Sequence, residues 1–336
     1  MSPFKLLQPA LWLFLLTTAV AGYIFSMIAW SSFELSVSDL YGYLFAFDSN
    51  SVEHQLLATL RAPRALASFL IGANLAIAGA IMQNLTHNPL SSPTILGINA
   101  GAACFITAAS IGVIGLAQLP TTVNALLGGT LSGVLVMLLG GFFSTRSHPL
   151  KIILAGIAIN ALFVGLTRTS VILADDSAYG VSWLAGSVAY IGWREWQSLW
   201  PISLVGCALA IYSIRGLNML TLGDEVAKGL GLNIQLTRII ACISALLLTT
   251  VSVAVAGPIA FIGLLAPHIA KILVGNNFIF LLPACALLGG SFLIWADGFS
   301  RAIVFPAETP VGVMTALIGS PYFIALSLRS RLSHAL

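Results

Sequence analysis

Residues 65–82 read "ALASFLIGANLAIAGAIM", and this stretch decides the fold class of the protein. It holds no charged residue, and it comes close to the roughly 20 apolar residues that a helix needs to cross a bilayer. Two arginines, Arg61 and Arg64, stand just before it, with no acidic residue in the four positions after either one. The stretch is therefore predicted to be a transmembrane helix with positive charge at its N-terminal end.

The composition of the whole chain extends this prediction. Apolar residues make up 58% of the 336 residues and charged residues only 7%, whereas a soluble domain is usually about a quarter charged. We therefore predict an all-α polytopic membrane protein with about ten transmembrane helices in one transmembrane domain, residues 1–336. The predicted spans are about 10–30, 61–83, 94–114, 122–142, 150–173, 196–214, 236–256, 260–275, 280–297 and 310–328.

Small residues recur at spacings of four within three of these spans. Such spacing lets two helix backbones approach closely where no water drives their association. Close helix packing is therefore predicted at three sets of positions: Gly72, Ala76 and Ala80; Gly129 and Gly133; and Gly312, Ala316 and Ser320.

Lysine and arginine in the connections predict the orientation. Cytoplasmic connections of membrane proteins carry an excess of these residues. With the N-terminus inside, nine fall on the inner side and five on the outer side, so both termini are predicted to be cytoplasmic. The five outer cations are all arginine, whose planar fork suits carboxylates. They are Arg61, Arg64, Arg168, Arg194 and Arg301.

Motifs for catalysis or energy coupling are missing from the sequence. There is no G-x-x-x-x-G-K-[ST] phosphate loop and no clustered His/Cys ligand set, and the net charge of +3 gives no indication of nucleic-acid binding. The strongest candidates for ionisable residues at membrane depth are Arg168 and Asp297, and Asp297 is spaced to form a local ion pair with Arg301. We predict that this chain forms a transport pathway with no energy source of its own. We also predict that it carries no catalytic residue, bound metal or cofactor.

Residues 215–235 form the longest predicted inner connection. Thr221–Asp224 is a typical helix start, and Gly229 and Gly231 are typical of a helix end. Val226, Ala227 and Leu230 are expected on one apolar face of this short helix. Two interpretations stay open: a helix that lies on the lipid interface, or one that docks into a groove of another protein.

Long motifs resemble a known family. The stretches "LRAPRALASFLIGANLAIAGAIMQNLTHNPLSSPTILGINAGA" (60–102), "LGDEVAKGLGLN" (222–233) and "SVAVAGPIAFIGLLAPHIAKIL" (252–273) resemble the iron-siderophore and vitamin B12 permease family of ABC importers. The resemblance implies a type II importer fold with ten helices per subunit. It also implies a second permease subunit around a central pathway, two cytoplasmic ATPase subunits that bind ATP and Mg, and a periplasmic binding protein.

The same resemblance assigns roles to particular residues. Arg61, Arg64 and Arg301 match positions that pair with glutamates of the binding protein, and the charges of Arg61 and Arg64 are expected to be free for that partner. The double substitution Arg61→Glu with Arg64→Glu is expected to impair docking far more than folding. The coupling segment 215–235 would contact the ATPase through Asp224, Glu225, Leu230 and Gly231, and a cytoplasmic gate is expected at Asn88, Leu90, Ser144, Thr145 and Ser147.

The cargo follows from finer similarities. The stretches "LTHNPLSSPTILGIN" (85–99), "ILAGIAINALFVGLTR" (153–168) and "DDSAYGVSWLAGSV" (175–188) most resemble ferric dicitrate permease subunits, which pair with a paralogue in the bacterial inner membrane. Arg168 and Arg194 could then give a positive vestibule for this anion, or they could simply pair with Asp175, Asp176 and Glu195. The alternatives are another siderophore, haem or cobalamin in the same machine, an autonomous secondary carrier, and an intramembrane enzyme.

Overall fold

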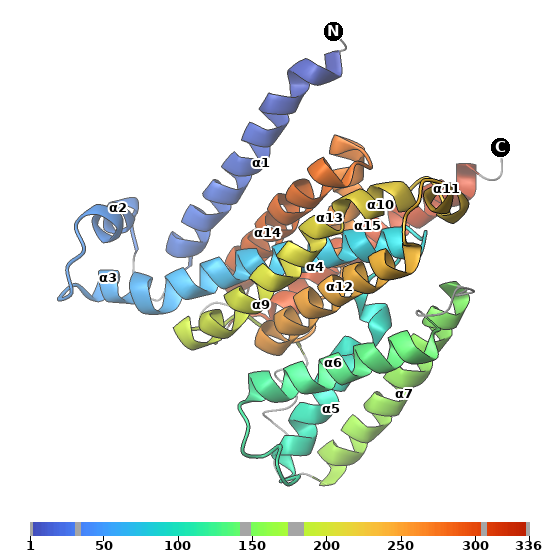
Figure 1. The fold of residues 1–336 in the computed structure, drawn as a ribbon. Coiled ribbons are helices and arrows are strands. Elements are labelled where there is room, and N and C mark those ends of the chain that lie inside the picture. Colours follow the sequence, from blue (N-terminus) through green and yellow to red (C-terminus); the bar gives the residue numbers. More distant parts are fainter. Residues whose placement is uncertain (1–2, 31–34, 142–148, 174–184, 304–307, 334–336) are drawn as a thin grey trace.

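The computed structural model describes residues 3–30, 35–141, 149–173, 185–303 and 308–333 (Figure 1). Every regular element in these ranges is a helix, which confirms the predicted all-α class. Each predicted span overlaps one of the longer helices: α1 (Pro3–Ile28), α4 (Ala62–Leu85), α5 (Ile98–Ser110), α6 (Thr121–Leu139), α7 (Pro149–Leu173), α9 (Trp193–Tyr212), α12 (Ile234–Ala256), α13 (Ile262–Val274), α14 (Phe278–Ile303) and α15 (Val311–Ser333).

Short helices fill several connections between these elements. They are α2 (Val37–Phe45), α3 (Val52–Leu56), the π-helix η1 (Leu57–Arg61), the 3-10 helix η2 (Pro93–Leu96), α10 (Ile214–Leu220) and α11 (Asp224–Gly229). Helices α3, η1 and α4 follow one another without a break, so residues 52–85 form one continuous apolar span.

Length and apolar composition qualify six of the described helices as membrane spans. A seventh results if α9 and α10, which meet at a bend of 52°, count as one broken span. Helices α5 and α13 and residues 311–324 of α15 are apolar but shorter than the length that a bilayer normally requires. The protein is thus a multi-pass membrane protein, while ten crossings and cytoplasmic termini stay predictions.

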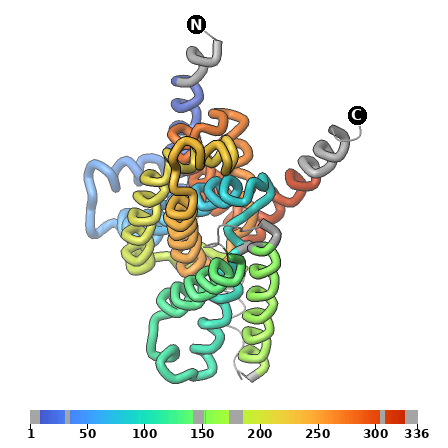
Figure 2. Tube along the Cα trace, turned by 45° about the vertical axis from the view of Figure 1, so that its right-hand side comes forward, coloured from blue at the N-terminus to red at the C-terminus, as the bar shows by residue number. Residues whose placement is uncertain are grey.

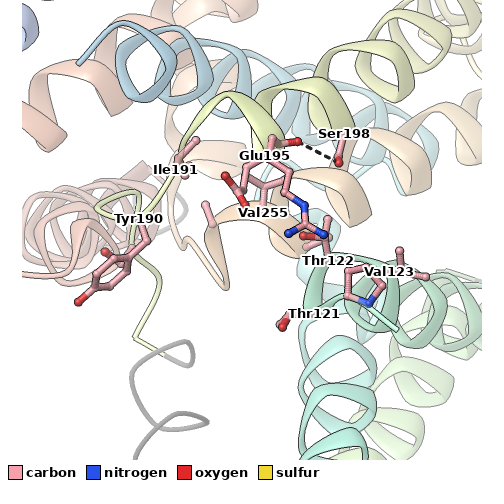
Figure 3. A pocket seen from close by; sticks show the side chains of 13 residues that line it. Thr121, Thr122, Val123, Tyr190, Ile191, Glu195, Ser198 and Val255 are labelled. Atoms are coloured by element: carbon pink, nitrogen blue, oxygen red, sulfur yellow. Dashed lines mark hydrogen bonds between the residues drawn. The ribbon is translucent and has the colours of Figure 1, made fainter. Parts of the chain in front are cut away.

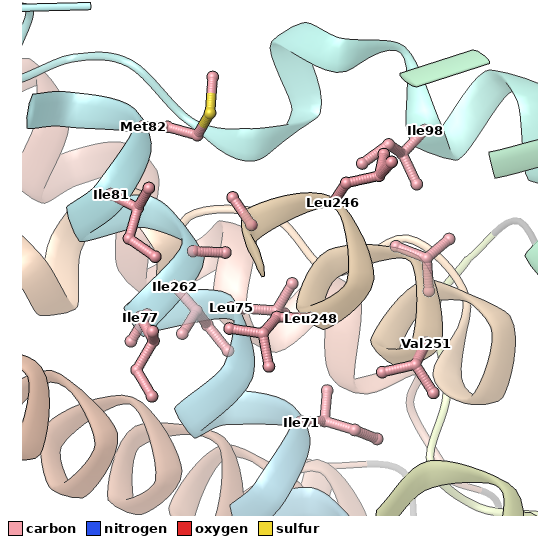
Figure 4. Close-up of a cluster of buried hydrophobic side chains, with 14 of the residues drawn as sticks. Ile71, Leu75, Ile77, Ile81, Met82, Ile98, Leu246, Leu248, Val251 and Ile262 are labelled. Carbon is pink, nitrogen blue, oxygen red and sulfur yellow. The ribbon is translucent and has the colours of Figure 1, made fainter. Parts of the chain in front are cut away.

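Helix α4 occupies the centre of the larger helix group and packs against α9, α12, α13 and α14 (Figure 1). Almost all of its side chains are buried, as expected for a helix that is apolar on every face. Its aliphatic side chains meet those of neighbouring helices in a continuous core (Figure 4). The labelled members of this core are Ile71, Leu75, Ile77, Ile81 and Met82 from α4, Ile98 from α5, Leu246, Leu248 and Val251 from α12, and Ile262 from α13.

Glycines bring α4 into backbone contact with two neighbours. A Cβ added at Gly72 would overlap the backbone of Gly289 in α14, and one added at Gly79 would overlap the backbone of Gly263 in α13. These contacts confirm the predicted close packing around Gly72. The second predicted set also packs closely, because Gly133 contacts Leu246 of α12.

Helices α5, α6 and α7 form a second group beside the first (Figure 2). Contacts of α12 with α5 and α6 join the two groups. The two ends of the molecule differ in character. We call the end that carries Arg61, Arg64 and Arg301 the arginine end, and the opposite end, which carries α11, the α11 end (Figure 1).

Candidate functional site

A buried carboxylate organises the arginine end. Asp297 of α14 has no exposed surface. Its Oδ1 accepts hydrogen bonds from Arg64 Nε at 3.0 Å and Arg64 Nη2 at 2.7 Å. Its Oδ2 accepts from Arg301 Nη2 at 3.1 Å and from Ser26 Oγ at 3.3 Å. The charge of this carboxylate is thus balanced by two guanidinium groups, which is the condition for burying an ion.

Arg301 also fastens α14 to the last turn of α1. Its Nη2 donates to the backbone oxygen of Ser26 at 2.9 Å and to Ser26 Oγ at 3.0 Å, and its Nη1 donates to the backbone oxygen of Ala29 at 3.1 Å. The residue is 2% exposed, so most of its donors are used inside the protein. Arg301 is therefore part of the packed interior of the arginine end.

Arg64 has a second acidic partner at the protein surface. Its Nη1 lies 2.9 Å from Glu308 Oε2, and the Glu308 side chain is 37% exposed. The backbone N–H of the next residue, Thr309, donates to the backbone oxygen of Ser300 in α14 at 3.2 Å. Glu308 thus covers the outer edge of the Arg64 guanidinium.

Arg61 differs from the other two arginines. Among the described residues, its side chain donates only to the backbone oxygens of Ala29 at 3.4 Å and Trp30 at 3.2 Å, and no carboxylate there forms a salt bridge with it. Trp30 adopts a left-handed backbone conformation (φ 41°) where it presents this oxygen. Arg61 therefore keeps a charge that nearby described acids do not neutralise by direct contact.

These contacts correct one expectation and confirm another. The expectation that the charge of Arg64 is free is wrong, because Arg64 is buried and paired with Asp297 and Glu308. The predicted local ion pair between Asp297 and Arg301 is confirmed. No sequence signal near Arg64 indicates its partners, since 233 residues separate it from Asp297 and 244 from Glu308.

Helix α11 at the opposite end has the boundaries expected from its sequence. Gly223 precedes it with φ 98°, and Gly231 follows its last turn with φ 83°. The N–H of Leu232 donates to the oxygen of Ala227 at 3.1 Å, a backbone bond that closes the helix end. Asp224 Oδ2 lies 2.7 Å from Arg238 Nη2, which joins the start of α11 to α12.

The apolar side chains of α11 do not share one face as predicted. Ala227 is fully buried against the protein, whereas Val226 is 50% and Leu230 59% exposed. Leu222, four residues before Val226, is also exposed. This corrects the expected single face: Ala227 anchors the helix, while Leu222, Val226 and Leu230 stand outward, together with Glu225.

The predicted gate residues Asn88 and Leu90 lie in the turn after α4. Asn88 Oδ1 accepts the backbone N–H of Leu90 at 2.9 Å, and Leu90 is exposed. In the same turn, His87 Nε2 lies 3.8 Å from Asp224 Oδ1, so the fold brings these gate candidates beside α11. Ser144, Thr145 and Ser147, the other gate candidates, lie outside the described residues.

A cavity of about 900 Å³ lies at the start of α9 (Figure 3). Arg194 is among the residues that line it. The starts of α6 and α9, the connection before α9 and the last turn of α12 form its walls. Trp193 Nε1 donates to the oxygen of Ala58 at 2.8 Å, which places the start of α9 beside η1 near the arginine end. The lining residues are Pro120, Thr121, Thr122, Val123, Ser187, Tyr190, Ile191, Arg194, Glu195, Ser198 and Ala254–Ala256.

The two predicted vestibule arginines lie in different places. Arg194 forms no salt bridge with Glu195, whose Oε2 instead accepts the backbone N–H of Gly192 at 2.9 Å. Arg168 is exposed on α7 and is not part of the cavity lining. Asp175 and Asp176, the other suggested partners, lie outside the described residues.

Within the described ranges, no three His, Cys, Asp or Glu side chains come together in a way that could hold a metal ion. The four cysteines, Cys104, Cys207, Cys242 and Cys285, are free and lie on separate helices.

Comparison with known proteins identifies the family. Residues 16–329 match the FecCD transport family. The chain is 39% identical to the Fe(3+)-citrate import system permease protein YfmD of Bacillus subtilis, over 89% of this chain and 88% of that protein. It is 40% identical to the Fe(3+) dicitrate transport system permease protein FecC of Escherichia coli, over 90% and 92%.

A relative with a different cargo is nearly as similar. The iron(3+)-hydroxamate import system permease protein FhuB of B. subtilis is 36% identical over 91% of this chain and 80% of that protein. The fold matches a solved structure of a metal-chelate type ABC transporter in an inward-facing conformation, with a TM-score of 0.84 and 29% identity over 96% of this chain and 99% of that one. This chain therefore belongs to the FecCD transport family of ABC importer permeases, membrane subunits without catalytic activity of their own.

Proposed function

We propose that this chain is the permease subunit of an importer for ferric chelates, with ferric dicitrate as its cargo. One observation carries the proposal: the chain is 39% and 40% identical to two ferric citrate permeases over nearly their whole length. The hydroxamate permease at 36% identity supports the alternative that another siderophore is carried.

The proposed machine contains several other subunits. A second permease, a paralogue of this chain, completes the pathway in the bacterial inner membrane, and a periplasmic binding protein delivers the chelate. Two ATPase subunits bind ATP and Mg and drive alternating access, because this chain has no phosphate loop of its own. The family match makes an autonomous secondary carrier the weaker candidate.

The arginine end is the proposed docking site for the binding protein. Three guanidinium groups, those of Arg61, Arg64 and Arg301, gather there with only two described carboxylates, Asp297 and Glu308, in contact with them. The cluster thus keeps an excess positive charge, which favours an acidic partner. Such complementarity mainly sets the orientation and rate of encounter.

Helix α11 is the proposed contact for the ATPase. Leu222, Val226 and Leu230 present exposed apolar surface, and the bond between Asp224 and Arg238 holds the helix against α12. An apolar knob on a firmly held helix suits the groove of a partner protein. A helix that lies on the lipid interface is the alternative for this segment.

The test is uptake of radioactive iron by cells that lack this gene and by cells in which it is restored. Iron is offered as citrate, as a hydroxamate and as a catecholate, and a strain whose partner ATPase cannot hydrolyse ATP serves as the control. We expect the strain that lacks this gene to lose uptake of ferric citrate and of no other chelate. The strain with the inactive ATPase should show the same loss. Loss with another chelate would refute the cargo, and uptake that persists without ATP hydrolysis would refute the importer.

A further inference from the structure

Glu308 is the accessible member of an otherwise buried charge cluster. Its side chain is 37% exposed, whereas the Arg64 side chain is 9% exposed and the Asp297 side chain 0%. The cluster therefore meets the outside chiefly through Glu308. A partner that docks at this end therefore encounters the Glu308 carboxylate, which already forms an ion pair with Arg64.

The guanidinium of Arg64 uses separate atoms for its two acids. Nε and Nη2 bind Asp297 Oδ1 at 3.0 and 2.7 Å, while Nη1 binds Glu308 at 2.9 to 3.0 Å. The Nη1 side can therefore change partner while the Asp297 side stays in place. This division gives Arg64 one structural contact and one exchangeable contact.

The two acids are held by different numbers of donors. Asp297 accepts from Arg64, Arg301 and Ser26 and lies wholly inside the protein. The described contacts of the Glu308 side chain are with Arg64 alone. Breaking the ion pair of Glu308 and moving its side chain into water therefore requires far less free energy than breaking the ion pairs of Asp297. The reason is that a partly exposed ion pair is weak, whereas breaking a buried one leaves an uncompensated charge inside the protein.

Charge balance decides what can replace Glu308. Once Glu308 leaves, Asp297 is the one remaining carboxylate against Arg61, Arg64 and Arg301 in the described part of the cluster. Arg61 lies three positions before Arg64, and in the described part of the chain its Nη groups donate only to backbone oxygens. An incoming carboxylate restores the negative charge that Glu308 supplied, whereas a neutral group leaves two guanidinium groups uncompensated and a basic group adds a further positive charge.

We propose that Glu308 is an internal occupant of the docking site, and that an acidic side chain of the binding protein displaces it from Arg64 Nη1. Arg61, which is 9% exposed and has no described carboxylate in contact, adds its positive charge to the attraction, and the exchange at Arg64 follows the encounter. Glu308 lies three residues before α15, and the bond from the Thr309 N–H to the Ser300 oxygen holds the backbone there, so the exchange needs only the Glu308 side chain to move. The inference rests on the docking function proposed above.

The experiment uses the complete importer in lipid nanodiscs and the purified substrate-binding protein that supports iron uptake by it. The dissociation constant is measured for the wild type and for Glu308→Gln and Glu308→Ala. Because a competing carboxylate has been removed, both variants are expected to bind the partner about two- to fivefold more tightly. The affinity of both should also depend more steeply on salt, since the site has gained net positive charge.

Glu53→Gln is the matched control. Glu53 is an acid on α3 at the same end, but its carboxylate accepts from Ser51 Oγ at 2.7 Å and forms no salt bridge with a described arginine. Its replacement is expected to leave the affinity unchanged. Unchanged or weaker binding by both Glu308 variants, in importers with wild-type melting temperature, would overturn the exchange.

Arg61→Gln separates this inference from the docking function itself. If docking occurs at the arginine end, this variant weakens binding whatever Glu308 does. Weaker binding by Arg61→Gln with no effect of Glu308 would refute the exchange and keep the docking site. No effect of Arg61→Gln would refute the docking site, and the exchange with it.

Discussion

Arg64 Nη2 lies 2.7 Å from Asp297 Oδ1, although 233 residues separate the two in the sequence. The contact joins the first turn of α4 to the last turns of α14, and Arg301 and Ser26 extend it to α1. The arginine end is therefore a structural joint between three helices as well as a candidate docking site.

Asp297→Asn is expected to destabilise the protein strongly. It removes the carboxylate that balances Arg64 and Arg301 inside the protein, and breaking a buried ion pair costs about 3–5 kcal/mol. Thermal unfolding of the purified importer measures the effect. Glu308→Gln, which alters a partly exposed pair, should cost less than about 1 kcal/mol. Equal stability of Asp297→Asn and wild type would contradict this account of the joint.

Arg61→Gln is expected to impair docking more than folding. The double substitution Arg61→Glu with Arg64→Glu does not separate these effects as expected from the sequence, because an acid at position 64 would face buried Asp297. Arg61 is 9% exposed, and its neutral replacement gives up two hydrogen bonds to backbone oxygens and no described ion pair, while it brings no acid into the buried cluster. Uptake should fall at least about tenfold, the equivalent of 1.4 kcal/mol, with normal amounts of protein in the membrane. Normal uptake by this variant would argue against docking at Arg61.

Leu230→Asp is expected to weaken the contact with the ATPase. Leu230 is 59% exposed beside α11, so a charge there should disturb a partner interface and leave the fold intact. Binding of the purified ATPase should weaken roughly tenfold or more. Leu119→Asp is the control, an exposed leucine in the connection between α5 and α6. If Leu230→Asp binds the ATPase as the wild type does, α11 serves the lipid interface instead.

Arg194→Gln is expected to slow uptake of ferric citrate more than Arg168→Gln does. Arg194 lines the cavity of about 900 Å³, whereas Arg168 lies on the exposed face of α7 outside that lining. A cation in a recess attracts an anion more effectively than one on an open surface, and the effect weakens with salt. Initial uptake rates at low and high ionic strength measure it. Equal effects of the two variants would exclude a special role for the cavity.

Gly79→Ala is expected to destabilise the protein by about 1–3 kcal/mol, the usual cost of overpacking. The added Cβ would overlap the backbone of Gly263, which cannot move aside as a flexible side chain could. Gly165→Ala in α7 is the matched control, because nothing lies within 4 Å of a Cβ at that position. Its stability should equal or slightly exceed that of the wild type, since alanine favours a helix more than glycine does. Equal melting temperatures of the two variants would refute the close contact of α4 with α13.

Local pattern was enough to predict the helices and much of α11. The run 65–82 forms a buried helix because only a helix satisfies its own backbone in an apolar surrounding. The glycines around α11 mark its ends because glycine readily adopts the positive φ angles found at Gly223 and Gly231. The ion pair of Asp297 with Arg301 was also predictable, since four residues span one helical turn.

Only the tertiary structure decided which charges are free. Arg64 looked unpaired because its acids lie more than 200 positions away, and no local pattern encodes contacts between distant helices. The outward face of α11 also depends on tertiary packing, because the buried position of Ala227 sets the orientation of the helix. The cavity at Arg194 depends on it too, because its walls come from three separate helices and the connection before α9. The sequence by itself determined the helices, because backbone hydrogen bonding and apolar length act locally. Helix packing determined the charge pairs and the cavity, because these depend on distances between segments remote along the chain.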